Sequence, residues 1–225
     1  RQFIADASHE IRSPLTIISA ELEFAQRSLA DGDAKNSIRI SLDEVGHLKH
    51  LTDDLLLLAK LDSQQLTLNR RYFRFDELAA DCIRKVKQVA AAKGTTIQLQ
   101  VEPGIEWYGD AEKISSVIII LLDNAIKYSF EKSAICVDLF LRDAKEIHLH
   151  VTNSGIGILP AELPLVFGRF FRSSATRNES SGNGLGLAIA RRIIELHSGT
   201  IAVSSIPQDK TVFRVQLPAI QPALS

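Results

Sequence analysis

The sequence contains little cysteine, no surplus of either charge and no long apolar run. Cys82 and Cys136 lie far apart in apolar segments, which favours two reduced thiols in the core over a disulfide or a zinc site. Lys and Arg number 26 against 27 Asp and Glu, a net charge of −1, and this balance argues against a nucleic-acid-binding protein. The longest apolar run, residues 117–122, is far shorter than the roughly 20 residues that span a bilayer.

What is present is the composition of a folded protein. Of the 225 residues, 45% are hydrophobic and 24% are charged, which excludes a disordered chain or a disulfide-stapled scaffold. No signal peptide opens the sequence. The chain begins at Arg1, without a methionine, and enters a helical pattern at once, so we expect it to be a piece of a longer protein.

The first 61 residues carry two amphipathic helical patterns. Residues 31–33 (Asp-Gly-Asp) interrupt a heptad repeat, and a second helix is predicted over about 36–61, which together make an antiparallel hairpin. The apolar stripe is too wide for one hairpin to cover, so the sequence predicts a homodimeric four-helix bundle. The heptad rows are Ile4, Ile11, Ile18 and Ala25, and Leu15, Leu22 and Leu29.

After residue 66 the heptads give way to shorter helices and strands. The pattern predicts three helices, at 76–92 (capped by Asp76 and ended by Lys93-Gly94), 111–128 (capped by Asp110) and 185–197. Strands are predicted over 70–75, 96–101, 134–141, 146–152, 200–205 and 211–217, and a Gly-rich polar stretch over 153–184. This order indicates an α+β sandwich, with helices packed on one face of a largely antiparallel sheet.

The segment 8–15 places His9 on a helix, beside the heptad seam rather than in it. Its imidazole is therefore expected to face solvent. Glu10 could take its proton, and Ser13, four residues on, shares its helix face. Pro14 costs a helix interior about 3 kcal/mol, so it marks a kink or a function. An inert, solvated histidine is the alternative interpretation.

Two further segments carry groups suited to a metal ion and a phosphate. In 121–129 an apolar helix turns polar, where Asn124 offers an oxygen ligand for Mg²⁺ and Lys127 could meet a phosphate from the same side. In 153–160, directly after a strand, two glycines would let the backbone approach a ligand closely. A frayed helix end and a plain turn are the respective alternatives.

The segment 182–188 opens a helix with three glycines. Free N–H groups and the helix dipole favour an anion there, which suggests a phosphate cradle. This segment matches neither a Walker A loop nor a GxGxxG fingerprint. Residues 167–172 contain two arginines, and the polar, Ser-rich run 173–181 that follows predicts a mobile lid.

In this order, the segments resemble the motifs of the sensor histidine kinases of two-component signalling. The resemblance covers nearly the whole chain, and five motifs in this order are specific although each alone is modest. The matching segments are 9–14 for the H box, 124–129 for the N box, 153–158 for the G1 box, 167–172 for the F box and 182–187 for the G2 box.

The resemblance implies a domain organisation and a set of partners. Residues 1–66 would be a dimerisation and histidine phosphoacceptor domain, and residues 67–220 a catalytic ATP-binding domain of the gyrase, Hsp90, histidine kinase and MutL type. It implies a homodimer that uses ATP and Mg²⁺, phosphorylates itself and transfers the phosphoryl group to the receiver domain of a response regulator, with no nucleic-acid partner. It further implies the cytoplasmic portion of a bacterial inner-membrane sensor, joined to the membrane only through segments outside this chain.

The resemblance also assigns roles to residues. His9 would be the phosphoacceptor, Glu10 its base, and Ser13 the residue that positions water for dephosphorylation of the partner. For ATP the matching residues are Asn124 (also for Mg²⁺), Lys127 (for a phosphate), Tyr128 (for the adenine), Asn153, Gly155, Gly157, Ile158, Arg169, Gly182, Gly184, Leu185, Gly186 and Leu187.

Two positions depart from the family pattern. The G1 box usually opens with an Asp that accepts a hydrogen bond from the adenine amino group, and here it opens with Asn153. The N box usually carries another Asn four residues before Asn124, where this sequence has Ile120. These departures leave open a degenerate kinase with weakened nucleotide binding, acting as a phosphatase or a dimeric interaction module. A gyrase- or MutL-like ATPase would fit residues 75–217 but would leave His9 on a heptad helix unexplained.

The wide apolar stripe leads to a prediction about assembly. Residues 1–66 alone should form a dimer, because a single hairpin cannot cover the stripe. Analytical ultracentrifugation of this fragment measures its mass in solution. A folded monomer would contradict the four-helix bundle.

Overall fold

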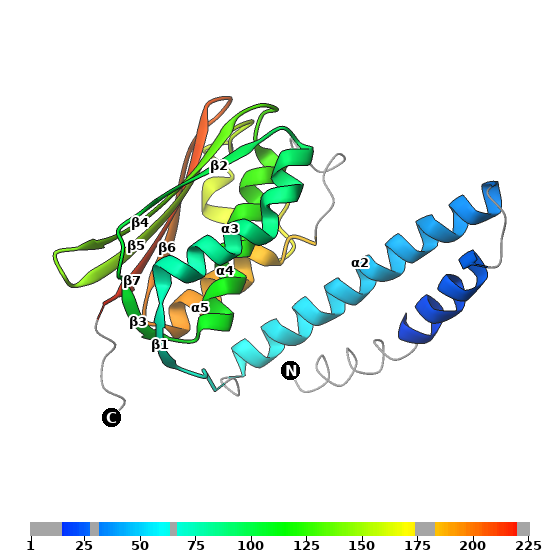
Figure 1. Cartoon of the computed structure of the whole chain (residues 1–225), viewed down its shortest axis with the longest axis horizontal. Coiled ribbons are helices and arrows are strands. Elements are labelled where there is room, and N and C mark those ends of the chain that lie inside the picture. Colours follow the sequence, from blue (N-terminus) through cyan, green and yellow to red (C-terminus); the bar gives the residue numbers. More distant parts are fainter. Residues whose placement is uncertain (1–14, 28–31, 64–66, 174–182, 220–225) are drawn as a thin grey trace. The chain divides into compact units, whose positions relative to one another are not determined.

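The computed structural model describes residues 15–27, 32–63, 67–173 and 183–219. Its contacts divide the chain into two compact units, Arg1–Thr67 and Leu68–Ser225. Figure 1 shows the helices and strands of each unit. None of the described helices is both long and apolar enough to cross a membrane.

The first unit contains a helix over 15–27 and the long helix α2 (Asp33–Asp62). This pair confirms the predicted helical hairpin, although α2 begins somewhat earlier than expected, directly after Gly32. Both helices leave large apolar side chains exposed, and a second copy of the hairpin would cover such a surface. These side chains are Ile17, Ile18, Phe24, Ile40 and Leu48.

The second unit holds the predicted sheet and helices. Its helices are α3 (Phe75–Ala92), α4 (Ala111–Tyr128), α5 (Gly186–Leu196) and the short 3-10 helix η1 (Leu163–Leu165). Its strands are β1 (Arg71–Arg74), β2 (Thr96–Val101), β3 (Glu106–Gly109), β4 (Ala134–Arg142), β5 (Glu146–Ser154), β6 (Thr200–Ile206) and β7 (Lys210–Pro218).

Five of these strands form one sheet in the order β2-β4-β5-β7-β6. Strand β2 runs parallel to β4 and the other neighbours are antiparallel, so the prediction of a largely antiparallel sheet is confirmed. Strands β1 and β3 pair separately as a two-stranded antiparallel ribbon. Helices α3, α4 and α5 lie against one face of the five-stranded sheet, as predicted (Figure 1).

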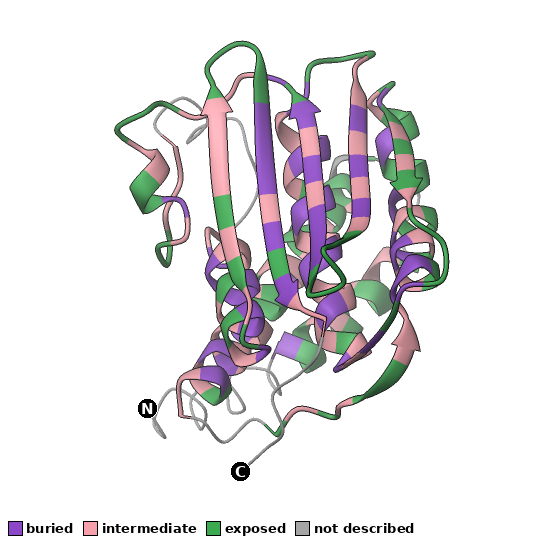
Figure 2. Ribbon diagram, turned by 90° about the vertical axis from the view of Figure 1, so that its left-hand side faces the viewer, coloured by how far each residue is buried: buried purple, intermediate pink, exposed green. Residues whose placement is uncertain are grey.

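The core lies between these helices and the sheet. Alternate residues of β4, Ile135, Val137 and Leu139, are buried, as are Leu149 and Val151 of β5 (Figure 2). This alternation follows from the two-residue period of a strand, which sends every second side chain to the helix-covered face. Helix α4 supplies an apolar stripe to this core, in which Val117, Ile118, Leu121 and Leu122 are buried.

Helix α4 begins where three hydrogen bonds meet on Asp110. The side chain of Asp110 accepts bonds from the backbone N–H of Lys113 (3.1 Å) and of Asn69 (2.9 Å), which confirms the predicted N-cap. The backbone N–H of Asp110 donates to Nε2 of His197 at 3.1 Å. His197 is fully buried, and burial lowers its pKa below the usual 6.5, which keeps that nitrogen available as an acceptor.

At the start of this unit one expectation is wrong and one strand was missed. Asp76 is not the N-cap of α3: Arg74 is, and the Asp76 carboxylate binds the Arg74 guanidinium (2.5 Å) and the backbone N–H of Gly104 (3.1 Å). A charged partner within reach draws the carboxylate away from the helix end. Strand β3 was not predicted, because it is four residues long and ends at Gly109.

The two cysteines have different surroundings. Both are free, as predicted, and Cys82 is buried on α3. Cys136 is only partly buried, so its expected place in the core is wrong. Its neighbours Ile135 and Val137 take the inward positions of β4, and the strand period therefore turns Cys136 to the opposite face.

The Asp76 pair leads to a prediction about acid stability. The Arg74 guanidinium lowers the pKa of Asp76 from 3.8 to about 2, so this pair stabilises the fold above about pH 4 and its contribution is lost as the pH falls toward 2. Asp76→Asn should therefore lower the free energy of unfolding by about 1–3 kcal/mol at pH 7, and the deficit should shrink between pH 4 and pH 2.5.

Fluorescence of the single tryptophan, Trp107, during urea unfolding measures this effect in the second unit. Asp81→Asn is the matched control, since Asp81 forms an exposed pair with Arg84 and should cost less than about 1 kcal/mol. An equal deficit for Asp76→Asn at all pH values would refute the role of its charge.

Candidate functional site

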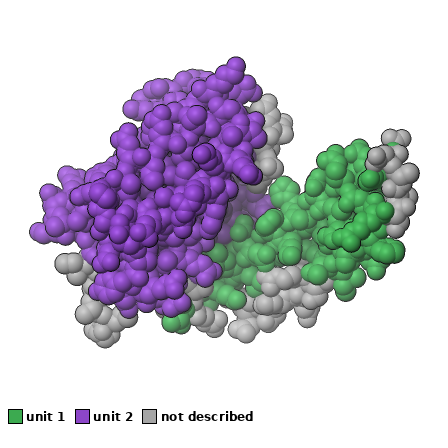
Figure 3. Space-filling view, in the orientation of Figure 1, with its two compact units in different colours: residues 1–67 green, residues 68–225 purple. Residues whose placement is uncertain are grey.

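The second unit, coloured purple in Figure 3, contains a cavity of about 320 Å³. It lies among the last turns of α4, the end of β5 and the residues after it, the start of α5, and residues 211–213 of β7. Most of the residues singled out for nucleotide binding line it: Asn124, Lys127, Tyr128, Asn153, Gly157, Ile158, Gly184, Gly186 and Leu187.

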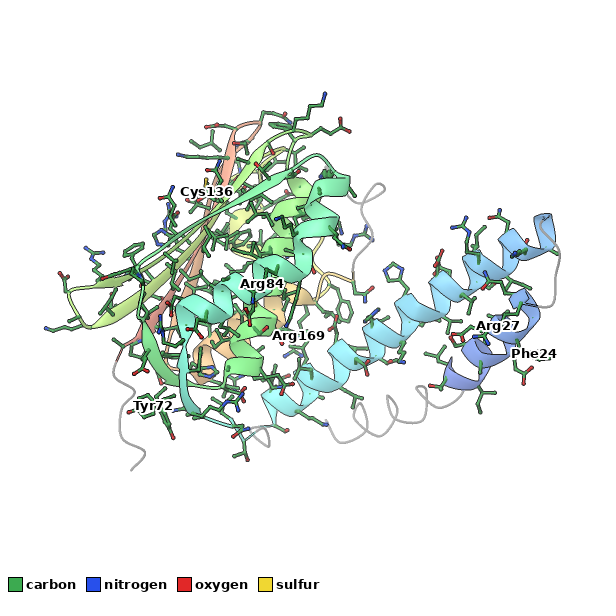
Figure 4. All side chains as sticks on the ribbon, viewed as in Figure 1. Phe24, Arg27, Tyr72, Arg84, Cys136 and Arg169 are labelled. Atoms are coloured by element: carbon green, nitrogen blue, oxygen red, sulfur yellow. The ribbon has the colours of Figure 1, made fainter. Side chains whose placement is uncertain are left out.

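Other residues singled out from the sequence lie elsewhere. His9, Glu10, Ser13, Gly182 and nearly all of the predicted lid fall outside the described residues. Arg169, labelled in Figure 4, is exposed and does not line the cavity. Gly155 and Leu185 do not line it either. Gly155 packs against the backbone of Tyr128, and Leu185 is buried in the core.

Helix α4 presents three of its side chains in the last two turns. Asn124 donates from Nδ2 to the carbonyl oxygen of Ile120 at 2.7 Å, which leaves its amide oxygen as an acceptor toward the cavity. Lys127 and Tyr128 follow, with the Lys127 ammonium 5.4 Å from the centre of the Tyr128 ring. Ile120 itself contributes an apolar wall.

Lys93, at the end of α3, holds the final turn of α4. Its Nζ donates to the carbonyl oxygens of Ile126 (2.8 Å) and Lys127 (2.6 Å). A cation at this place satisfies carbonyl groups that have no partner within the helix and complements the helix dipole. Partial burial lowers the pKa of Lys93.

Gly155 joins the end of β5 to the end of α4. A Cβ at this position would lie 1.9 Å from the carbonyl oxygen of Tyr128, so only glycine permits the approach. Gly155 forms a bridge with Ser129, and the N–H of Ile156 donates to the same Tyr128 oxygen at 3.3 Å. The contact brings the polar end of β5 beside Lys127 and Tyr128.

Two buried polar side chains stand side by side on the sheet. Asn153 of β5 is 3% exposed, and its cross-strand partner Thr211 of β7 is 5% exposed. Oγ1 of Thr211 lies 2.8 Å from Oγ of Ser205, which also accepts a bond from the N–H of Ile158 at 2.9 Å. Sequence reasoning missed Thr211, because its place beside Asn153 depends on the register between β5 and β7.

The start of α5 closes the other side of the cavity. Gly184 has a φ of +67°, and a Cβ there would lie 2.7 Å from the carbonyl oxygen of Phe171. Gly186 packs on Ile120, while Leu185 is fully buried in the core and is the N-cap residue without a side-chain bond to the helix. The first N–H groups of α5 therefore lack a side-chain cap and favour an anion.

Charged side chains also lie at the cavity. Lys127 and Arg172 line the cavity, and Arg172 could have been singled out from its place in a basic segment. Asp123 is exposed at the rim, where partial loss of solvent raises its pKa. The described part of the chain contains no group of three or more His, Cys, Asp or Glu side chains able to hold a metal ion by themselves.

Comparison with known proteins identifies the family. A model of the His Kinase A (phospho-acceptor) domain matches residues 1–64, and a model of the histidine kinase-, DNA gyrase B- and HSP90-like ATPases matches residues 109–221. The chain belongs to the sensor histidine kinases. The resemblance inferred from the five motifs is thereby confirmed, and the match over 1–64 sets this kinase core apart from a gyrase- or MutL-like ATPase.

Curated relatives agree with this assignment. The kinase core is 36% identical to the heme sensor protein HssS of Staphylococcus haemolyticus, over 97% of this chain and 47% of that protein. It is 33% identical to the histidine kinase ArlS of Staphylococcus epidermidis, over 98% of this chain and 48% of that protein. The chain thus spans about half the length of the curated relatives it matches.

Solved structures share the fold. The Acinetobacter baumannii histidine kinase AdeS superposes with a TM-score of 0.70 at 26% identity, covering 94% of this chain and 98% of that one. Full-length ShkA in complex with AMPPNP superposes with a TM-score of 0.85 at 21% identity, covering 96% of this chain and 45% of that one. At this lower identity the likeness to ShkA concerns the fold.

The close contact at Gly155 leads to a testable prediction. Gly155→Ala would place a methyl group 1.9 Å from the Tyr128 oxygen, so β5 and α4 must move apart. We expect the free energy of unfolding followed by Trp107 fluorescence to fall by about 1–3 kcal/mol, and the affinity for ADP in calorimetry to fall with it.

Gly46→Ala provides the control, since nothing lies within 4 Å of a Cβ at this position of α2. It should leave both the tryptophan transition and ADP binding unchanged. Unaltered ADP binding by Gly155→Ala would show that this contact does not shape the cavity.

Proposed function

We propose that this kinase core phosphorylates His9 with ATP and passes the phosphoryl group to an aspartate of a response regulator. In this proposal residues 1–66 are the dimerisation and phosphoacceptor domain, and residues 67–220 bind ATP. The observation that carries it is a single cavity into which the predicted N-, G1- and G2-box segments all contribute residues, in a chain whose first 64 residues match a phosphoacceptor domain.

The cavity has one side suited to phosphates and another suited to a base. Lys127, Arg172 and the N-terminal turn of α5 supply positive charge and free N–H groups for the phosphates. Ile158 and Phe213 supply apolar surface for a purine, and Asn153 supplies a buried amide for its polar edge.

A magnesium ion fits this site as a companion of the nucleotide. Asn124 would hold it through the amide oxygen, which is oriented by the bond from its Nδ2 to Ile120. Mg²⁺ usually takes few protein ligands and completes its shell with phosphate oxygens and water, so one amide oxygen suffices. When bound, it offsets the negative charge of the phosphates during transfer.

The proposed chemistry is an in-line displacement by an imidazole. A ring nitrogen of His9 attacks the γ-phosphorus, a P–N bond forms as the bond to the β-phosphate oxygen breaks, and ADP leaves. Glu10 takes the imidazole proton. The phosphoryl group then moves to an aspartate carboxylate of the response regulator as the P–N bond to His9 breaks. Ser13 would position a water molecule for the separate phosphatase reaction, in which that phosphoaspartate is hydrolysed to aspartate and inorganic phosphate.

The partners and location belong to the same proposal. The apolar side chains exposed on the hairpin support a homodimer, and the family supports a response-regulator receiver domain as the second partner. The chain spans about half of its curated relatives, which include sensor proteins, so we place it in the cytoplasmic portion of a membrane-bound bacterial sensor.

One observation favours a second candidate function. Ile120 puts an apolar side chain one turn before Asn124, so the α4 side of the cavity offers one amide fewer than the family pattern. A kinase core with weak nucleotide binding would act chiefly as a phosphatase of its response regulator or as a dimeric interaction module.

A substitution at His9 tests the proposed reaction. His9→Gln should abolish incorporation of label from γ-labelled ATP with Mg²⁺, because the nucleophile is lost, while calorimetry should find ADP affinity unchanged. The label on the unaltered protein should be acid-labile, as expected for a phosphoramidate.

His50→Gln is the matched control, since His50 is an exposed histidine of the same unit and should leave labelling unchanged. Retention of acid-labile label on His9→Gln would refute the phosphoacceptor assignment. An unaltered protein that takes no label but dephosphorylates its response regulator would favour the second candidate function.

A further inference from the structure

On the sheet side, the cavity is lined by two polar side chains whose roles as hydrogen-bond donor or acceptor are not fixed. Asn153 and Thr211 are buried neighbours on β5 and β7, and both line the cavity. Ile156, Ile158 and Phe213, which line the same cavity, are apolar. A ligand edge that reaches this end must therefore satisfy its hydrogen bonds with an amide and a hydroxyl.

The amide of Asn153 is not committed to either orientation. Within the described part of the chain, neither Oδ1 nor Nδ2 of Asn153 forms a hydrogen bond, and its side chain lines the cavity. The oxygen of a side-chain amide accepts hydrogen bonds and its NH2 group donates them, and a rotation of the amide by 180° exchanges their positions. Asn153 can therefore present either end to a ligand.

The hydroxyl of Thr211 is equally adaptable. It lies 2.8 Å from the Ser205 hydroxyl, and either oxygen can be the donor. When Ser205 donates instead to the carbonyl oxygen of Lys210 (3.2 Å), Thr211 donates to Ser205 and turns a lone pair to the cavity. When Ser205 donates to Thr211, the Thr211 proton is free for the ligand.

Purines differ at this kind of edge by the same exchange. Adenine presents a donor at its 6-amino group beside an acceptor at N1, whereas a 6-oxopurine presents an acceptor at O6 beside a donor at N1. An amide complements both patterns by rotating, but a carboxylate only accepts and so complements the amino group alone. On β5 and β7, no carboxylate lines the cavity.

We propose that this site accepts 6-oxopurine nucleotides as well as adenine nucleotides, with Asn153 as the residue that sets the specificity. The inference rests on the proposed function, in which the cavity binds a nucleotide with its base toward β5 and β7. The chain would then draw phosphoryl groups from inosine and guanosine nucleotides as well as from ATP.

Calorimetric titration of the full chain with ADP and with IDP, both with Mg²⁺, tests the inference. IDP differs from ADP only in its 6-oxo group and the proton at N1, so it isolates the reading of this edge. The unaltered protein should bind the two within about 5-fold of each other. Asn153→Asp should bind ADP about 5- to 30-fold more tightly and IDP more weakly, because a carboxylate strengthens the bond to an amino group and repels O6.

Two further variants make the result specific. Asn36→Asp adds the same charge on α2, outside the residues that line the cavity, and should leave the ratio of the two affinities unchanged. Thr211→Val should weaken ADP and IDP by a similar factor, because the hydroxyl serves both. Trp107 fluorescence checks that the second unit of the Asn153→Asp and Thr211→Val variants is folded.

The outcomes separate the inference from the function on which it rests. An unaltered protein that prefers ADP to IDP by more than about 30-fold, or a ratio that Asn153→Asp leaves unchanged, would overturn the inference while ADP binding still supports the proposed function. Failure to bind either nucleotide would overturn both.

Discussion

The contact between the backbone of Gly155 and the carbonyl oxygen of Tyr128 determines where the groups of the cavity lie. It fixes the end of β5 against the end of α4, so that Asn153 on the sheet and Lys127 on the helix face one space. The N–H of Gly155 also donates to the carbonyl oxygen of Asp209 at 2.9 Å, which ties the same point to the turn between β6 and β7. One short segment thereby connects β5, α4 and the turn that leads into β7.

Helix α4 is fixed by hydrogen bonds at both ends, so the backbone that carries the cavity residues of its last two turns is held in place. At its start, Asp110 receives two backbone N–H bonds and donates its own to the buried, neutral His197. At its end, Lys93 binds the last carbonyl groups from α3. A side chain on a helix fixed in this way loses little conformational freedom when a ligand arrives, which favours binding.

Much of this arrangement could be predicted from the sequence because it depends on local chemistry. The cap at Asp110, the apolar run of α4 and the alternation along β4 each show in a few neighbouring residues. The features that were missed or misassigned depend on contacts between residues distant in sequence, or on a nearby side chain that competes for the same group. The Asp76 carboxylate binds the Arg74 guanidinium instead of capping the helix, and Thr211 lies beside Asn153 only because β7 pairs with β5. Strand β3 is four residues long and pairs with β1, far back in the chain.

The joint at Gly155 consists of main-chain atoms, and this separates the framework of the site from its selectivity. A hydrogen bond between backbone groups needs no particular side chain on either neighbour, so the residues that project from the joint can change while the joint persists. Asn153 precedes it by two positions on the strand, and Lys127 lies just before its helical half. A lineage could therefore retune which nucleotide it uses through single substitutions, without first rebuilding the architecture that presents them.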